Sequence, residues 1–542
     1  MHRLFLVLLA LAACAGNPPA QHGATTPVHV QLLAFNDFHG NLEPPPGNVR
    51  LSDGTVPAGG GAWLAAHVAR LRAEEPDTLV VAAGDLVGAS PLASALSHDE
   101  PTITLMDALG LDVSSVGNHE FDDGAEELLR LQRGGCRPDD ATCKAHGFAG
   151  ARFTYLAANV FDRSGKTLFP PTVLKKVGGA TIGFVGVVLR ETPTVVTPTG
   201  VAGLSFGDEA DVVNAAVPKL REAGADAIVV LIHQGGAQSP GSPPGECRGF
   251  SGPLVGLAQR FRGVDVIVSG HQHQAYVCPD LGGALATSAG AYGRFLTRIE
   301  LDLDPVEHRV LSRKATQIPV THDIAPDARG KAIVDRAVAD SAPLASRRVG
   351  RLAARLSRSP NEAGESMLGD TVADAHLAAT RKTGAAIALT NPGGLRADLP
   401  AGDVTYAQAF AAQPFGNTLV TFSLTGAQLL AALEQQWLGS RPRILQPSTN
   451  LTYSWSGAAP PGSKVLPGTL KVDGRLIAPD TRIRVTMNSF LADGGDGFLV
   501  FPEGTDRVGG PPDLEALIEY LRPTLDGAPL PRPSSPRITR AP

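Results

Sequence analysis

Short apolar runs alternate with amphipathic segments through the first half of the chain. The runs are largely apolar, which predicts buried strands. These predicted strands are Val28–Phe35, Leu79–Ala83, Val113–Val116, Ile182–Val188, Ile228–Ile232 and Val264–Val268. Segments with helical spacing lie between several of them, at Trp63–Leu71, Glu126–Leu131 and Ala210–Leu220. The alternation predicts an α/β fold.

The strand pattern stops around Asp304, and a predicted helix over Pro326–Ala339 is interpreted as a linker. A second α/β pattern follows it. Its predicted elements are the helix Gly369–Thr380, the strand Ala385–Thr390 and the helix Asp513–Arg522. The predicted division is a first domain over 28–322, a linker over 323–347, a smaller domain over 348–522 and a disordered, proline-rich tail over 523–542.

The composition is that of a globular protein with no bias toward nucleic acid. A length of 542 residues exceeds one ordinary core, which agrees with two domains. Charged residues make up 18% of the chain, and the formal net charge is −6. This balance offers no basic surface for nucleic acid, so no nucleic-acid partner is expected.

The first residues have the pattern of an export signal. A short basic start, Met1-His2-Arg3, precedes the apolar stretch Leu4–Ala12, which is too short to span a bilayer. The stretch ends in Leu11-Ala12-Ala13-Cys14, which resembles a bacterial lipobox. We expect residues 1–14 to be a lipoprotein signal peptide, Cys14 to be lipidated and residues 15–27 to be a tether. The alternative is cleavage without lipidation, which would give a soluble periplasmic or secreted protein.

The remaining cysteines agree with export. Cys136, Cys143, Cys247 and Cys278 are an even number, as expected for disulfides in an oxidising compartment. The simplest pairing joins Cys136 to Cys143 and Cys247 to Cys278, although sequence alone does not prove the connectivity. A thiolate metal site is the alternative, but it lacks CxxC spacing.

Metal-type residues follow five of the apolar runs. Asp37 and His39 follow the first strand, and Asp85 follows the second through Gly84. The other positions are Asn118 with His119, then His233, and finally His271 with His273. Functional groups in α/β sheets lie beyond the carboxyl ends of strands, so these side chains are expected to converge. Two divalent ions about 3.5–4 Å apart need a bridging carboxylate with His, Asp and amide ligands, and Asp85 is the natural bridge. Zn, Mn or Fe would suit this set.

The motifs NDFHG, GD, GNHEFD, LIHQGG and SGHQH resemble those of the calcineurin-like metallophosphoesterases, specifically the bacterial 5′-nucleotidase and UDP-sugar hydrolase group. The resemblance runs from about Val28 to about Arg522. It implies a first domain of two packed sheets flanked by helices, a linker helix and a smaller α/β substrate-binding domain.

The resemblance also implies roles for individual residues. One metal would be held by Asp37, His39, Asp85 and His273, and the other by Asp85, Asn118, His233 and His271. His119 would contact the phosphate, with Asp122 as its catalytic partner, and Asn118 would also face the substrate. Glu120 is expected to be structural, because the resemblance gives it no role.

The second domain carries residues that the resemblance assigns to a nucleoside pocket. Taken without it, Phe415 and Phe490 favour a core position and Asp496 a turn. With it, both Phe rings sandwich the base, Asp496 binds the ribose, and Asn391 and Arg396 reach the phosphate. Two departures stand out: Pro392 replaces a common Gly, and the stretch 361–366 lacks an expected Arg, with Arg358 the nearest cation.

The expected function is that of an exported phosphohydrolase with two divalent metals, acting on nucleotides, with UDP-sugars and cyclic nucleotides as further candidate substrates. One alternative keeps the chemistry on a non-nucleotide phosphoester or a sulfur-centred ester. An alternative of another class is a non-catalytic lipoprotein that binds metal or nucleotide. The expected partners are a small nucleotide and, through the lipid anchor, a membrane; the protein is expected to be a monomer.

Overall fold

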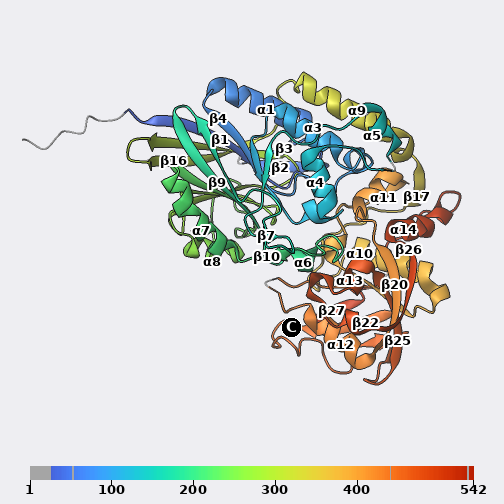
Figure 1. Ribbon diagram of the computed structural model, residues 1–542. Coiled ribbons are helices and arrows are strands. Elements are labelled where there is room, and N and C mark those ends of the chain that lie inside the picture. The colour runs from blue at the N-terminus through green and yellow to red at the C-terminus, as the bar shows by residue number, and fades with distance from the viewer. Residues whose placement is uncertain (1–25, 52–53, 139, 440, 534–535, 542) are drawn as a thin grey trace, which may run out of the picture.

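The computed structural model describes residues 26–51, 54–138, 140–439, 441–533 and 536–541. Figure 1 shows a larger body built from the N-terminal part and a smaller one built from the C-terminal part, joined near the helix α9 (Ala328–Ala345). The predicted signal peptide, with Cys14, and all but two residues of the predicted tether lie outside the described residues. Within the described ranges, no helix has the length and apolarity to cross a membrane.

The first of two six-stranded sheets contains the N-terminal strand. In spatial order its strands are β16 (Arg309–Pro319), β15 (Phe295–Asp304), β1 (Val28–Phe35), β4 (Thr78–Ala83), β5 (Val113–Ser115) and β6 (Thr154–Leu156). Strands β1, β4, β5 and β6 are parallel, whereas β15 pairs antiparallel with β1. The carboxyl ends of β1, β4 and β5 therefore meet at one edge.

The second six-stranded sheet packs face to face on the first. Its order is β13 (Ala275–Leu281), β14 (Ala284–Ala289), β12 (Val266–Ser269), β11 (Ala227–His233), β9 (Ala180–Val188) and β8 (Thr172–Val177). Leu32 of β1, Phe184 of β9 and Leu231 of β11 belong to one buried cluster between the sheets. Apolar side chains on both inner faces form this core, which confirms the predicted pair of packed sheets.

Helices cover the outer faces of both sheets. On the first sheet lie α1 (Gly61–Glu74) and α3 (Glu100–Leu109), with α9 packed on these two helices, and on the second lie α7 (Glu209–Glu222) and α8 (Pro253–Arg260). Shorter elements fill the connections: β2 (Asn48–Leu51), β3 (Gly54–Pro57), α2 (Leu92–Ala95), η1 (His119–Phe121), α4 (Ala125–Arg133), α5 (Ala141–His146), β7 (Val160–Phe161), α6 (Thr192–Val195) and β10 (Ser205–Phe206).

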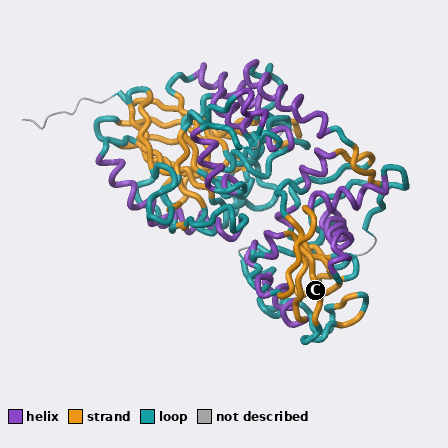
Figure 2. Tube along the Cα trace, turned by 45° about the vertical axis from the view of Figure 1, so that its right-hand side comes forward, coloured by secondary structure: helices purple, strands orange, loops and turns teal. Residues whose placement is uncertain are grey.

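The smaller body is built on a five-stranded sheet, visible in the lower part of Figure 2. Its order is β21 (Gln446–Pro447), β18 (Ile387–Thr390), β25 (Arg482–Asn488), β20 (Thr418–Thr425) and β26 (Thr505–Pro512). The longer helices are α10 (Met367–Thr380), α11 (Tyr406–Ala412), α12 (Gly426–Gln435) and α14 (Asp513–Leu521). Shorter strands complete the α/β arrangement: the pair β17 (Arg348–Leu352) with β19 (Gly402–Thr405), and β22 (Leu451–Ser456), β23 (Lys471–Val472) and β24 (Arg475–Leu476). The short helices are α13 (Ser489–Ala492) and the single turns η2 (Arg381–Thr383), η3 (Pro392–Gly394), η4 (Gly495–Gly497) and η5 (Phe501–Glu503).

The prediction of a disordered tail is wrong. The turn η6 (Arg522–Thr524) and the strand β27 (Ile538–Ala541) order it, and β27 pairs in parallel with β22. Arg537 is buried, and its guanidinium lies 2.6 Å from Oδ2 of Asp374 and donates to the Pro447 carbonyl. A buried charge is tolerated where it is paired and hydrogen-bonded, and the proline-rich composition of the tail conceals this anchor.

Two further elements differ from their predictions. Helix α9 continues through Pro343 to Ala345, because its buried residues pack on the first sheet's helices and a late proline removes only one backbone donor. Strand β16 extends the sheet past Asp304, where the strand pattern stops. As an edge strand it is largely polar and partly exposed, so it lacks an apolar run.

Both expected disulfides are present. Cys136 pairs with Cys143, with a Cα–Cα distance of 5.5 Å, and Cys247 pairs with Cys278 at 5.0 Å. The first closes the short loop around α5, and the second ties the loop after β11 to strand β13.

Candidate metal centre

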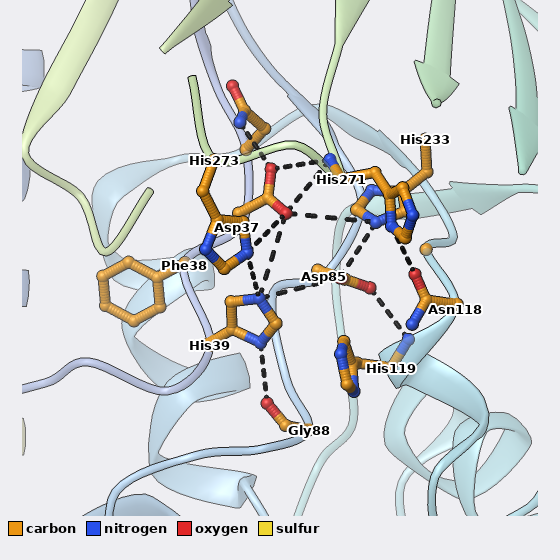
Figure 3. A network of polar contacts seen from close by, with 12 residues as sticks. Asp37, Phe38, His39, Asp85, Gly88, Asn118, His119, His233, His271 and His273 are labelled. Atoms are coloured by element: carbon orange, nitrogen blue, oxygen red, sulfur yellow. Dashed lines mark hydrogen bonds and ion pairs between the residues drawn. The ribbon is translucent and has the colours of Figure 1, made fainter. Parts of the chain in front are cut away.

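The predicted metal ligands converge at the edge where the parallel strands of both sheets end (Figure 3). Nε2 of His233 lies 2.9 Å from Oδ2 of Asp85, and Nε2 of His273 lies 3.2 Å from Oδ1 of Asp37. Nε2 of His39 lies 3.6 Å from Oδ2 of Asp85. Side chains from the two ends of the first domain's sequence therefore share one site.

The converging atoms divide into two adjoining groups. Asp37, His39 and His273 offer one set of ligand atoms within 4.8 Å of one another, and Asp85, His233 and His271 offer another. Oδ1 of Asn118 lies 2.9 Å from Nδ1 of His271, which places its amide at the second group.

The donor atoms fit cations. The Nε2 atoms of His39 and His273 face each other at 3.1 Å, an arrangement that two imidazoles adopt when they converge on one ligand. Carboxylate and imidazole donors are the types that divalent transition metals take, and Asp85 adjoins both groups. The residues present fit two divalent metal ions.

The backbone at the site adopts conformations that non-glycine residues rarely take. The residues Asp37, His39, Asp85, His271 and His273 all have positive φ, between 47° and 70°. Such strain concentrates at functional sites, where the surrounding structure holds it. The chain also needs glycines here: a Cβ on Gly117 would overlap Oδ1 of Asp85, and one on Gly270 would lie 2.9 Å from Nδ1 of His233.

Burial sets the protonation of two imidazoles. It lowers the pKa of His39 well below the usual value, and burial together with nearby His233 lowers the pKa of His271 to about 3. Both rings therefore favour the neutral form, which is the form that binds metal.

His119 has a different environment from the ligand histidines. Its Nδ1 lies 2.8 Å from Oδ2 of Asp122, and its backbone N–H donates to Oδ1 of Asp85. Burial opposes a charge on His119, but the carboxylates of Asp122 and Asp85 outweigh it and raise the pKa of the ring. The ring favours the cationic form beside the metal groups.

A cavity of about 220 Å³ borders His119 and reaches the smaller body. The Phe415 ring stacks on the His119 ring at 5.7 Å between centroids, and the Arg396 guanidinium lies 5.8 Å from the Phe415 ring. The structure thus brings Phe415 and Arg396 from the second domain to the catalytic candidates of the first.

Glu120 supports the loop that carries the candidate bridging carboxylate. Its carboxylate accepts hydrogen bonds from the backbone N–H groups of Asp85 and Leu86, at 2.8 and 2.7 Å, and from that of Gly117. These bonds confirm the structural role predicted for Glu120.

The remaining pocket candidates bond to one another rather than to the metal groups. Nδ2 of Asn391 donates to Oδ2 of Asp496 at 2.7 Å, and Phe490 packs against Gly495 next to Asp496. Arg443, which no sequence motif selects, donates to the Asp496 carbonyl at 2.8 Å and lies 3.6 Å from its carboxylate. Arg443 follows an irregular loop, so its position carries no periodic signal.

The stretch 361–366, where the resemblance leads us to expect a phosphate-binding Arg, faces the C-terminal tail. The Glu365 carboxylate accepts from the backbone N–H of Arg537 at 2.7 Å, and Ser366 caps helix α10. Arg358 instead lines a cavity that also touches His273.

Comparisons with known proteins agree with the geometry. The family model for calcineurin-like phosphoesterases matches residues 30–275, and the model for the 5′-nucleotidase C-terminal domain matches residues 345–503. The cell wall protein Lmo0130 of Listeria monocytogenes is 31% identical over 95% of this chain and 69% of its own length. The endonuclease YhcR of Bacillus subtilis is also 31% identical, over 96% of this chain, but the chain spans only 42% of that protein.

The fold agreement extends over both bodies. The crystal structure of a 5′-nucleotidase precursor from Thermus thermophilus superposes with a TM-score of 0.77 at 29% identity, covering 94% of this chain and 99% of that one. Together with the two family matches, this identifies both domains and their order. The chain belongs to the 5′-nucleotidase family of calcineurin-like metallophosphoesterases.

Proposed function

We propose that this protein is an exported 5′-nucleotidase that releases phosphate from nucleotides. Its family makes it a metal-dependent phosphoester hydrolase, and the choice of nucleotides as substrates rests on the second domain. The observation that carries the proposal is the contact between the two domains, where Phe415 stacks on His119 beside the metal groups.

The metal ions would be held by the two groups of converging side chains. We assign Asp37, His39, Asp85 and His273 to one ion and Asp85, Asn118, His233 and His271 to the other. When bound, the two ions supply Lewis-acid activation of water and neutralise charge on the phosphate oxygens. The Asp37 and Asp85 carboxylates and the His39 and His233 imidazoles are buried, so the protein rather than solvent positions them.

His119 and Arg396 would stabilise the charge that develops on the phosphoryl oxygens. Asp122 holds the His119 ring through Nδ1, which leaves Nε2 as a donor to an oxygen of the substrate. Arg396, fixed over the Phe415 ring, offers a guanidinium suited to bidentate phosphate contact. Positioned donors of this kind contribute through electrostatic preorganisation.

The nucleoside would be bound by the second domain. We assign base stacking to Phe415 and Phe490, the ribose hydroxyls to Asp496 and further phosphate contact to Asn391. Every base has a π-face that can stack on an aromatic ring, so broad base specificity is expected.

A phosphate-release panel tests the proposal. Purified protein with Mn or Zn is assayed on nucleoside mono-, di- and triphosphates, UDP-glucose and cyclic nucleotides, with His119→Ala as the matched inactive variant. We expect release from nucleoside monophosphates that falls about 10²–10³-fold in His119→Ala. Release from none of these compounds with any metal would rule the proposal out.

Export and lipid attachment form a separate part of the proposal. The lipobox-like Leu11-Ala12-Ala13-Cys14 supports lipidation of Cys14, and the disulfides Cys136–Cys143 and Cys247–Cys278 suit an oxidising compartment. The full chain should partition into the detergent phase in a bacterial host, whereas Cys14→Ser should not. Equal partitioning of both proteins would contradict the anchor.

A further inference from the structure

A second cavity, of about 690 Å³, borders the metal centre at His273 and does not include His119. This volume lies within the range of small-molecule sites. Its walls come from strand β2, the loop 238–244 and the segment 290–295, and Arg358 of the second domain completes it. The nucleoside pocket proposed above does not use this space.

The cavity carries a concentration of positive charge. Arg50, Arg294 and Arg358 all line it, and none of the lining residues that the structure describes is acidic. In a chain of net charge −6, three guanidiniums around one cavity attract anions, and Arg is the side chain best matched to phosphate. We call this space the arginine chamber.

A strained tyrosine connects the arginine chamber to the metal centre. Tyr292 has φ of 62°, and its backbone N–H donates to the Asp37 carbonyl at 2.8 Å. Its ring lies 5.3 Å from the His273 ring, while the Arg294 guanidinium lies 5.6 Å from the Tyr292 ring. One aromatic ring therefore separates the metal ligands from Arg294.

The Arg294 guanidinium has few hydrogen-bond partners among the described residues. One Nη donates to the Pro46 carbonyl at 2.6 Å, and its buried Nε has no hydrogen-bond partner among the described residues. A guanidinium has five N–H donors, so the Arg294 side chain at the wall of the chamber keeps donors that can bind an anion.

The opposite wall is held in place before any ligand arrives. The disulfide Cys247–Cys278 ties the loop to β13, and Ala237 and Ser251 exchange two backbone hydrogen bonds across it, at 2.8 and 3.0 Å. Nε2 of Gln238 donates to the Ala275 carbonyl at 2.9 Å. A preformed wall lowers the entropic cost of binding.

We propose that the arginine chamber binds a second phosphate group of the substrate, on the side of the scissile phosphorus away from the nucleoside. The proposal rests on the proposed function and names a substrate class for the same centre: phosphodiesters that join a nucleoside 5′-phosphate to a further phosphorylated group. A nucleoside monophosphate does not reach the chamber.

The reaction on such a diester is a simple hydrolysis. The oxygen of one water molecule forms the new bond to phosphorus, and the bond from phosphorus to the oxygen of the phosphorylated group breaks. That oxygen leaves with one proton, so the products are a nucleoside 5′-phosphate and a phosphorylated alcohol. No oxidant or reductant is needed.

Matched dinucleotides test the chamber. Adenylyl-(3′→5′)-adenosine is compared with the same dinucleotide carrying a 5′-terminal phosphate, and AMP is assayed beside them. For wild-type protein we expect kcat/KM for cleavage of the internucleotide phosphodiester to be about tenfold higher or more when the dinucleotide carries the terminal phosphate. This factor corresponds to one charge-assisted contact. The ratio should fall toward one in Arg294→Gln and in Arg50→Gln, and Arg294→Lys should retain part of it.

Arg248→Gln is the matched control, because Arg248 lies further along the same loop, pairs with Glu246 and does not line the chamber. It should keep the wild-type ratio. If Arg294→Gln folds poorly in a thermal melt, Arg50→Gln decides the test, since Arg50 is exposed on a surface hairpin.

The outcomes separate the two proposals. A ratio near one in the wild type, or no cleavage of either dinucleotide, overturns the arginine chamber even if AMP is hydrolysed. Cleavage with an arginine-dependent ratio but no release from AMP keeps the chamber and overturns the nucleotidase proposal. A wild-type ratio unchanged by both arginine variants also overturns the chamber.

Discussion

Nδ1 of His119 lies 2.8 Å from Oδ2 of Asp122, while the backbone N–H of the same histidine donates to Asp85. The ring is thus fixed from two directions, by a carboxylate behind it and by the candidate bridging carboxylate beside it. Because Phe415 of the second domain stacks on its face, this one side chain links the metal centre to the substrate-binding domain.

Asp122→Asn should lower kcat for AMP about 10²-fold and change KM little. The amide cannot favour the imidazolium, so the histidine loses charge and orientation at the point where the transition state needs a donor. Steady-state kinetics measure the effect. Asp123→Asn is the control, because the Asp123 side chain lines the same cavity but is 65% exposed and forms an ion pair with Arg137 instead. An equal loss in both variants would contradict the role of Asp122.

Phe415→Ala should raise KM for AMP by about tenfold, since one base stack is worth roughly 1–3 kcal/mol. The same variant is assayed on p-nitrophenyl phosphate, which has no nucleobase. We expect a smaller rise in KM for that ester. If both substrates lose affinity equally, Phe415 acts through the packing of His119 and not through the base.

Arg537→Ala should destabilise the smaller body, because it removes a buried guanidinium and leaves the partly buried Asp374 carboxylate without its partner at 2.6 Å. Breaking a buried ion pair costs about 3–5 kcal/mol. A thermal melt should show a lower unfolding midpoint, whereas Thr539→Ala, at an exposed position on the adjoining strand β27, should melt like the wild type. Unchanged melting of Arg537→Ala would mean that the tail adds nothing to stability.

The buried carboxyl of Asp513, which lies away from the metal centre, should make the stability of the fold depend on pH. Burial raises the pKa of its carboxyl to about 7, although the backbone N–H of Leu514 donates to it. The unfolded chain ionises this group near pH 4, so between about pH 4 and 7 the folded state holds the extra proton. Its contribution to stability is present below about pH 4 and is lost as the pH rises to about 7.

Asp513→Asn should remove this loss, because the amide keeps an oxygen for Leu514 and carries no charge. The difference in melting temperature between variant and wild type should grow in favour of the variant from about pH 5 to about pH 8. Glu515→Gln, exposed on the same helix, should show no such trend. A constant difference for Asp513→Asn would contradict the assigned pKa.

The strands that carry the centre are predictable from sequence because they are buried on both faces. The runs ending before Asp85 and His233 are apolar throughout, and the run before Asp37 is mostly apolar. Their carboxyl ends meet because neighbouring parallel strands end at the same edge of a sheet. The edge strand β16 escapes prediction for the opposite reason, since its exposed residues follow no apolar pattern. The ordered tail escapes it because one buried Arg537, in a segment rich in proline, gives no periodic signal.

The centre is easier to predict than the substrate pocket. His271 and His273 stand in a motif, whereas Arg443 and Tyr292 act through contacts that tertiary folding alone creates. The positive φ of Tyr292 is likewise invisible in a sequence, because tyrosine has no preference for that conformation.

Metal content measured together with phosphate release tests the central claim most directly. Purified protein loaded with Mn or Zn should contain two ions per chain and release phosphate from AMP. After chelation both should be lost, and restoring the metal should return both. Asp85→Ala should hold fewer ions and show at most residual release, because Asp85 adjoins both ligand groups. Full phosphate release by metal-free protein, or by Asp85→Ala, would contradict the two-metal account.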